Sequence, residues 1–371
     1  MTAKSIMPGK QKQPVQPKAE DFGSYQINIF RDLLCNTSTE RDSLSNVFDL
    51  WDSIPRYVVS RQQQEKWRRA GSFPLLHEVP FHYRGRELLA TIQPAAVKGS
   101  DGVIRTYFPS ANEELIEDVL RKIAAEQKNG YYAPRERRSG VVFTLHMVRK
   151  ELANRGHGRT YKEINLSLDI MSSAVIQTGT VDGKDGDFTS KSLYLNNLFR
   201  VSKDKLAEAP DAKWFVDFHP FASRALDELT YRQFNYARLM SHKSQLARWL
   251  NKVLSLKYLN ASLLHPFEMR FSTIMRDSSL LNGYSVLRLA VAAVDAAFEE
   301  LQVCQPPLLD TKAEKILIEG KRGKILDVVY TLRPSREFMA EMKAANKRRS
   351  LAADSPGLVD NFVAERRKQG E

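Results

Sequence analysis

Apolar residues in this chain recur with two different periods, and the order of these periods predicts its elements. The clearest helical period falls between Ser110 and Gly130, where apolar residues from Leu115 to Ile123 return every three or four positions. Ser110 followed three residues later by Glu113 is the signature of a capping box. Gly130 is a suitable helix stop. We therefore predict one amphipathic helix here.

Two further helices are predicted after a short strand. Thr144 is the expected N-cap of the first, and a glycine turn at 156–158 leads into the second over 159–174. Two helices joined by so short a turn form a helix-turn-helix. An Asp-Gly-rich turn at 181–187 between two short segments then predicts a β-hairpin. Upstream, two strands are expected to join at Arg84-Gly85.

The second half of the chain repeats the order of helix, helix-turn-helix and hairpin. Helices are expected over 221–239 and 241–259, a turn at Asn282-Gly283 precedes a long helix, and a final hairpin turns at 320–323. This order is that of a winged helix. The predicted fold class is α+β, with two tandem winged-helix domains over 75–205 and 212–334.

The two ends of the chain lack these patterns. Residues 1 to about 24 are rich in Lys, Pro and Gln, while 25–57 carry short apolar clusters, so 1–57 is predicted to be a disordered leader and docking segment. The alternative for its later half is that Trp51 and Ile54 pack against the first domain. Residues 335–371 are predicted to be helical and then a disordered basic tail.

Composition narrows the class of partner. Lys and Arg number 56 against 44 Asp and Glu, which gives a net charge of +12 and favours an anionic partner. No apolar run approaches the ~20 residues of a membrane span, and the N-terminus has no secretory signal, so we expect a cytoplasmic protein without a membrane partner. Cys35 and Cys304 are the only cysteines, which excludes a disulfide framework.

Catalytic motifs are absent from the sequence. None of the seven histidines forms the His-x-His pair that a nicking enzyme would need, and Tyr231 and Tyr236 fall on an expected helix. Gly183-Lys184 is followed by Asp185, so there is no phosphate-binding P-loop. We therefore predict a binding protein rather than an enzyme, with no cofactor, catalytic residue or metal ligand.

The candidate DNA contacts lie at the start of each second helix, which enters the major groove in helix-turn-helix proteins. Arg159 and Asn165 suit guanine and adenine edges, and Lys162 suits a phosphate. The first set is Arg159, Thr160, Lys162, Asn165 and Ser167; the second is Asn282, Tyr284, Ser285 and Arg288, with Lys321, Arg322 and Lys324 in the hairpin. Leu287 is expected to face the core. The alternative is that these are ordinary solvent-exposed polar residues.

Taken together, these residues resemble a family, the iteron-binding replication initiators of bacterial plasmids, of the broad-host-range type. The resemblance covers roughly 45–333 and rests on order and spacing, with its best local matches at 141–171 and 218–250. In the latter, Phe234, Leu239, Ser241 and Arg248 fill places typical of the family. The resemblance implies binding to direct repeats (iterons) in double-stranded origin DNA, origin opening, and recruitment of the host replicative helicase and β sliding clamp.

In that family a short segment of the form Gln-Leu-Ser-Leu-Phe docks on the clamp. Residues 26–30 are similar, with Gln26 and Phe30 at the ends and Ile27 and Ile29 between them, while 46–55 is a competing segment. Two other functions stay open: a transcriptional repressor or copy-number regulator bound to its own promoter, and a nicking or primase-type enzyme. Whether the chain forms a homodimer is also open.

Overall fold

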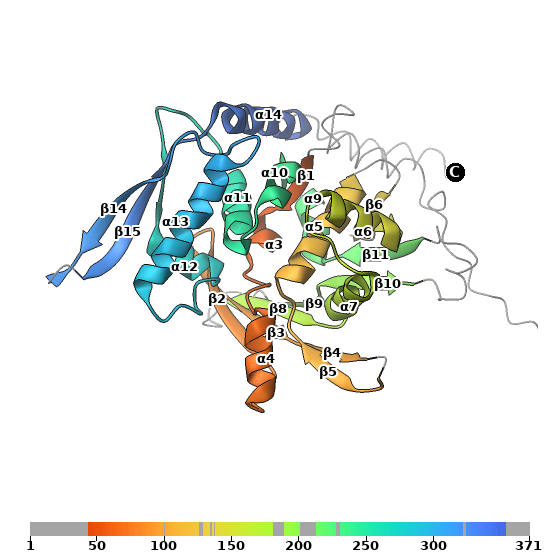
Figure 1. Ribbon diagram of the computed structural model, residues 1–371. Coiled ribbons are helices and arrows are strands. Elements are labelled where there is room, and N and C mark those ends of the chain that lie inside the picture. The colour runs from red at the N-terminus through yellow and green to blue at the C-terminus, as the bar shows by residue number, and fades with distance from the viewer. Residues whose placement is uncertain are drawn as a thin grey trace, which may run out of the picture.

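The computed structural model describes residues 44–99, 101–125, 129–133, 136, 138–180, 189–200, 213–227, 231–321 and 324–353. Helices and antiparallel sheets form two units that lie side by side (Figure 1). The core of the first unit is built from residues between Val47 and Met240, and that of the second from residues between Leu246 and Met342. The fold is therefore mixed α and β, as the sequence predicts.

The first unit contains two four-stranded sheets, ordered β2-β3-β8-β9 and β10-β11-β7-β6. Its central helices are α5 (Ala111–Ala125), α6 (Leu145–Asn154) and α7 (Tyr161–Met171). The strands of these sheets and of a separate β4-β5 hairpin are β2 (His77–Tyr83), β3 (Arg86–Gln93), β4 (Ala95–Lys98), β5 (Ile104–Tyr107), β6 (Gly130–Ala133), β7 (Arg138–Phe143), β8 (Val175–Thr180), β9 (Thr189–Leu193), β10 (Leu195–Phe199) and β11 (Trp214–Phe218).

Three local signals in this region are confirmed, whereas Gly130, the expected helix stop, begins β6 after α5 has ended at Ala125. Glu113 accepts a hydrogen bond from the Ser110 backbone N–H at 2.8 Å, one arm of the expected capping box. Thr144 caps α6 by accepting from the Met147 N–H. The turn between β2 and β3 falls at Arg84 and Gly85, both with positive φ, which a tight hairpin turn requires.

The prediction of a docking segment is wrong for residues 44–57. They form β1 (Leu44–Phe48) and α3 (Asp49–Ser53), followed after a loop by α4 (Arg61–Arg69). Trp51 is fully buried and stacks on His219 with ring centroids 4.0 Å apart. The apolar clusters thus complete the first core, which was the alternative interpretation of this segment. Residues 26–30 lie outside the described part of the chain.

The predicted boundary at 212 and the predicted helix over 221–239 are also wrong. Strand β11 inserts between β7 and β10 of the first unit. The chain then forms α9 (Pro220–Asp227), β12 (Tyr231–Asn235) and α10 (Tyr236–Ser241), and β12 pairs antiparallel with β1. Tertiary pairing overrides local helical preference here. The boundary between the two cores lies between Ser241 and Gln245.

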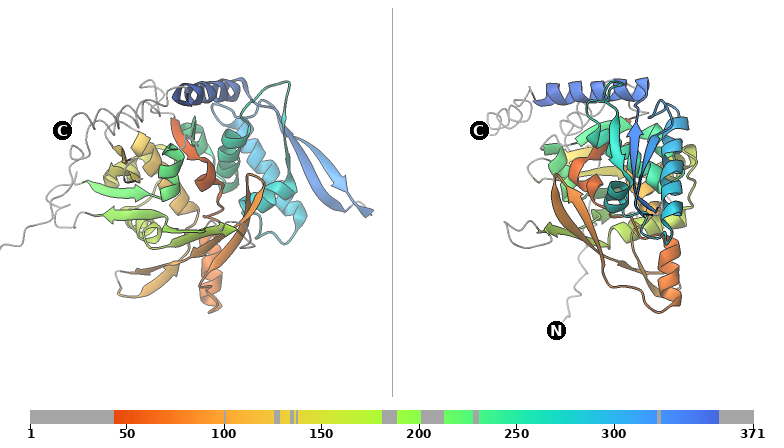
Figure 2. Two further views of the ribbon diagram at one scale, coloured as in Figure 1. Left: turned by 180° about the vertical axis from the view of Figure 1, so that it is seen from behind. Right: turned by 90° about the vertical axis from the view of Figure 1, so that its left-hand side faces the viewer.

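The second unit has a simple order. It runs α11 (Gln245–Lys257), β13 (Phe267–Arg270), α12 (Phe271–Ser278), α13 (Leu287–Val303), β14 (Glu314–Glu319) and β15 (Ile325–Leu332). The three strands form one antiparallel sheet in the order β13-β15-β14. The β14-β15 hairpin projects from the body of the molecule, which Figure 1 and the left view of Figure 2 show.

The C-terminal helix α14 (Arg336–Ala353) belongs to the fold rather than to a tail. Phe338 and Met342 are buried in the second core. Glu341 accepts from the guanidinium of Arg238 on α10 at 2.8 and 3.1 Å, so the helix also contacts the first unit. The prediction of helix after 335 is confirmed, while residues 354–371 lie outside the described chain.

Candidate nucleic-acid interface

In the first unit, α6 and α7 follow each other across a short turn, at the place where the sequence predicts a helix-turn-helix. Val148 and Leu152 on α6 and Ile164 and Leu168 on α7 are buried, which fixes the outward face of α7. Thr160 is the N-cap of α7 and exchanges capping-box hydrogen bonds with Glu163. These hydrogen bonds to Thr160 lower the pKa of the Glu163 carboxyl. The side chain of Thr160 is therefore engaged in capping the N-terminus of α7.

A chain of hydrogen bonds anchors α7 on α5. Arg159 donates to Asn112, Asn112 donates to the Ser167 hydroxyl at 3.0 Å, and Ser167 donates to Glu113 at 2.6 Å. Arg61 on α4 closes the chain with an ion pair to Glu113 at 2.6 Å. Ser167 is only 1% exposed, so its prediction as a DNA contact is wrong. Ser167 lies on the side of α7 that packs against α5, where its hydroxyl contacts Asn112 and Glu113.

The other members of the first set lie at the surface. Lys162 is exposed, Asn165 is half-buried, and Arg159 is half-buried with its guanidinium also donating to the Gly158 carbonyl at 2.9 Å. The last contact fixes Arg159 at the turn. Its Nε is engaged by Asn112, and part of the group still faces solvent.

Two cations on α6 were missed by the sequence analysis. Arg149 and Lys150 are exposed, and the Arg149 guanidinium lies over the Tyr161 ring, 4.8 Å from its centroid. Through this ring contact Arg149 adjoins the start of α7, and Lys150 is the next residue on α6. The helical wheel of α6 could have revealed them, since Val148 and Leu152 mark the opposite, buried face.

In the second unit, all four predicted residues are exposed around the start of α13. Asn282, Tyr284 and Ser285 lie in the turn after α12, and Arg288 lies in the first turn of α13. Leu287 was predicted to face the core and is exposed instead, because the core-facing stripe begins with Ala290 and Val291. The helix therefore presents its first turn, including Leu287, to solvent.

The β14-β15 hairpin carries the remaining predicted cations. Lys321 and Lys324 are exposed, and the Gly320 N–H donates to the Lys324 carbonyl at 2.8 Å, which closes the turn. Neither lysine pairs with a carboxylate in the described part of the chain, and the same holds for Arg288. Arg322 lies outside the described residues. The hairpin thus holds two uncompensated positive charges on a projecting arm.

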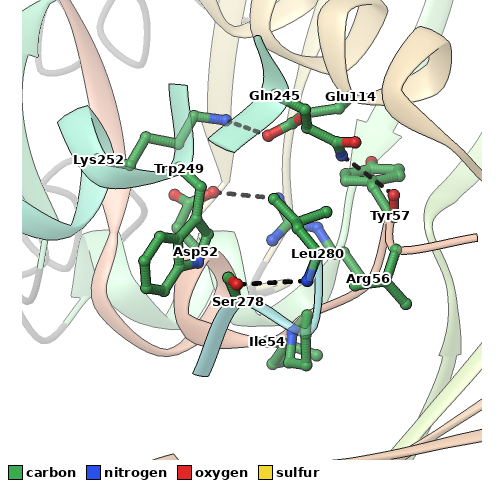
Figure 3. Close-up of a pocket in the computed structure, with 12 residues that line it drawn as sticks. Asp52, Ile54, Arg56, Tyr57, Glu114, Gln245, Trp249, Lys252, Ser278 and Leu280 are labelled. Carbon is green, nitrogen blue, oxygen red and sulfur yellow. Dashed lines mark hydrogen bonds and ion pairs between the residues drawn. The ribbon is translucent and has the colours of Figure 1, made fainter. Parts of the chain in front are cut away.

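A small cavity lies at the seam between the two units (Figure 3). Lys252 of α11 reaches Asp118 at 2.8 Å and Glu114 at 3.3 Å, both on α5. Arg56 pairs with Asp52 at 3.0 Å. Burial raises the pKa of Asp118 to about 6 despite the opposing charge of Lys252. The charged groups around the cavity form ion pairs with one another, and the Lys252 pairs join α11 of the second unit to α5 of the first. We therefore interpret this region as part of the contact between the units and not as a ligand site.

Within the described ranges, no group of three or more His, Cys, Asp or Glu side chains could hold a metal ion. A search of the same residues finds no helix long and apolar enough to cross a membrane.

Comparison with known proteins returns structural similarity only. No protein-family model matches the chain, and no curated protein matches it. A crystal structure of domains 2 and 3 of RctB, a selenomethionine derivative, has a TM-score of 0.48 and 11% identity, covering 76% of this chain and 97% of that one. A second structure of RctB domains 2-3 has a TM-score of 0.42 and 11% identity, covering 72% and 95%.

The Pi initiator protein in complex with iteron DNA has a TM-score of 0.33 and 10% identity, covering 80% of this chain and 99% of that one. Because these TM-scores are below 0.5 and the identities are low, we base the proposed function on the geometry of this chain.

Proposed function

We propose that this protein is a replication initiator that binds direct repeats in double-stranded origin DNA through two winged-helix units, without catalysing a reaction. The observation that carries the proposal is the repetition of one element order. In each unit a helix and then one or two strands precede a helix-turn-helix, and a β-hairpin follows. The order is α5, β6-β7, α6, α7 and β8-β9 in the first unit, and α11, β13, α12, α13 and β14-β15 in the second.

The exposed chemistry supports DNA as the ligand. Lys162 lies in the first turn of α7, and Arg149 of α6 lies over Tyr161 in the same turn, with Lys150 exposed next to it in sequence. Arg288 lies in the first turn of α13, and Lys321 and Lys324 lie at the turn of the second hairpin. Helix starts in the major groove with cations on the flanking phosphates are the usual arrangement of helix-turn-helix proteins. The net charge of +12 has the sign that this requires.

The difference between the two units favours direct repeats. Palindromic sites reflect the two-fold symmetry of a dimer of identical reading heads. Here one chain carries two non-identical units, held together by the Lys252 ion pairs and by α14. Such a chain reads an asymmetric sequence, and several copies of it occupy an array of equally oriented sites. Origin opening and recruitment of the host helicase and β clamp are extended to this chain from the family resemblance.

Footprinting of the full chain on the DNA adjoining its own gene tests the proposal. We expect protection of several directly repeated sites, each long enough to engage both units. The variant Lys321→Ala/Lys324→Ala should weaken binding, whereas Lys343→Ala, an exposed lysine on α14, serves as the control. Protection of one palindrome would favour the repressor, and metal-dependent nicking of supercoiled DNA would favour the enzyme.

Origin activity needs a separate assay. A plasmid that carries the repeat array but no initiator gene should replicate when this protein is supplied in trans. If the protein binds the array and such a plasmid is never maintained, the protein regulates a promoter instead.

A further inference from the structure

The start of α13 exposes large apolar side chains where the start of α7 exposes polar ones. Tyr284 is 45% exposed, Val286 49% and Leu289 57%, with Leu287 beside them. The corresponding stretch of the first unit is Thr160, Tyr161, Lys162 and Glu163, which is mostly polar. The two reading helices therefore offer different chemistry.

These apolar residues are not part of the second core. The stripe that packs inward from α13 is made of Ala290, Val291 and Val294, all buried. Leu289 precedes that stripe by one position and points away from it, and Val286 is the N-cap residue. Met275 on α12 is also partly exposed. A set of exposed apolar side chains this dense indicates a binding surface.

Charge around this surface identifies the class of occupant. Arg288 lies within it, and Arg270 at the start of α12 is exposed as well. Lys321 and Lys324 are exposed at the turn of the projecting β14-β15 hairpin, and this hairpin contacts α13 through the Lys315–Asp295 ion pair at 2.6 Å. An apolar surface that contains Arg288, on a unit with further exposed cations, matches a ligand with an apolar centre and anionic borders. The major groove has this pattern wherever thymines occur, because the thymine 5-methyl is its apolar group and phosphates line both edges.

We propose that the second unit recognises thymine 5-methyl groups in the major groove through Val286, Leu289 and Tyr284. The proposal rests on the DNA-binding function proposed above and specifies what that site reads. In this arrangement Arg288 and the hairpin lysines hold the phosphates, and the apolar side chains distinguish thymine from cytosine. The second half of each repeat is therefore rich in thymine on the strand that faces α13, whereas the first half is read by hydrogen bonds.

Replacing thymine by uracil tests this directly, because uracil keeps every Watson–Crick contact and lacks only the methyl. The probe is a duplex selected by the full chain from a random-sequence library, synthesised with thymine or with deoxyuridine in one half-site at a time. A methyl group withdrawn from water is worth about 0.8 kcal/mol, so each contacted methyl should change the Kd about four-fold. We expect weaker binding when uracil replaces thymine in the second half-site.

The variant Leu289→Ala should reduce the effect of the methyl group, measured as the ratio of the Kd for the uracil duplex to that for the thymine duplex. Val303→Ala, an exposed apolar residue at the other end of α13, should leave this ratio unchanged. Thermal unfolding of both variants checks that each still folds, which their exposure favours.

The outcomes separate the two proposals. If the library yields no preferred duplex, the DNA-binding function itself is refuted. If a duplex is selected and uracil in the second half-site has no effect, thymine recognition is overturned while DNA binding stands. If Leu289→Ala instead changes the sedimentation of the free protein and leaves the ratio intact, the surface binds a second copy of the chain, and the proposal is overturned.

Discussion

Glu117 is the residue whose replacement tests most sharply whether residues 44–57 belong to the fold. One carboxylate oxygen accepts from Trp51 Nε1 and from Arg121, each at 2.6 Å; the other accepts from the Tyr57 hydroxyl at 2.6 Å and from Arg56 at 2.8 Å. Burial opposes ionisation, but Arg121 and Arg56 outweigh it and hold the pKa of Glu117 well below its usual range. Four donors from two segments thus converge on one buried charge.

The variant Glu117→Gln removes that charge and half of the acceptor capacity. The amide NH₂ would face two of the four donors, and the two guanidiniums would share Asp52 as their remaining counter-charge. Breaking a buried ion pair on one side costs about 3 to 5 kcal/mol. At roughly 2 °C per kcal/mol for a protein of this size, the unfolding temperature should fall by about 6 to 10 °C.

Urea unfolding and thermal scans at pH 7 measure this loss. The matched control is Glu65→Gln, which breaks an ion pair with Arg68 in which the Glu65 side chain is 55% exposed. An exposed pair contributes no more than ~1 kcal/mol. If Glu117→Gln costs no more than the control, the polar anchoring of residues 51–57 is refuted. Because the pKa of Glu117 is depressed, its contribution should be constant above about pH 4.5 and decline only in stronger acid.

Three further predictions concern a buried histidine, a buried serine and the exposed hairpin. Burial lowers the pKa of His219 to about 3, so the unfolded imidazole takes up a proton below about pH 6.5 that the folded one does not. Relative to His219→Phe, the wild-type chain should therefore lose about 2 kcal/mol of unfolding free energy between pH 6.5 and 5, at roughly 1.4 kcal/mol per pH unit. Urea titrations at several pH values measure this, and an equal dependence of the unfolding free energy on pH in both proteins would contradict the prediction. Ser167→Ala should cost about 1 to 3 kcal/mol, because Glu113 and Asn112 each lose one hydrogen-bond partner, yet it should leave the sequence selected from a DNA library unchanged. An altered selection would restore Ser167 as a DNA contact. In the variant Lys321→Ala/Lys324→Ala, the slope of log K against log salt should decrease by roughly 0.9 for each phosphate that the variant no longer neutralises, and an unchanged slope would remove the hairpin from the interface.

The sequence predicted the elements that depend on local signals. Capping residues such as Thr144 and Thr160 and the turn at Arg84-Gly85 mark boundaries through contacts within a few residues, so they can be read directly. Strand β12 could not be read in this way, because it exists as a strand only by pairing with β1, almost 190 residues earlier. The same long-range dependence hid the role of Trp51, whose partners Glu117 and His219 are distant in sequence.

For the candidate site, the sequence predicted that the first turns of α7 and α13 are exposed to solvent. It did not predict which side of each helix faces outward. A polar residue such as Ser167 has the character of a surface position, yet its hydroxyl is engaged by α5. Conversely, Leu287 has the character of a core position although the inward stripe starts three positions later. A small rotation of a helix about its axis decides whether Ser167 is buried and whether Leu287 is exposed. This rotation is set by packing against the neighbouring helix.

Under the proposed function, the seam between the units has a consequence for the spacing of bases in the DNA site. Lys252 paired with Asp118, together with α14 bound to Arg238, holds the two reading helices at one separation and one angle. B-DNA turns once in about 10.5 base pairs, so inserting about five base pairs between two half-sites would rotate one of them to the opposite side of the duplex. A flexible linker would tolerate that insertion, whereas this seam would leave one reading helix facing away from its bases. Under that function, buried ion pairs that never touch DNA would set the length of each origin repeat.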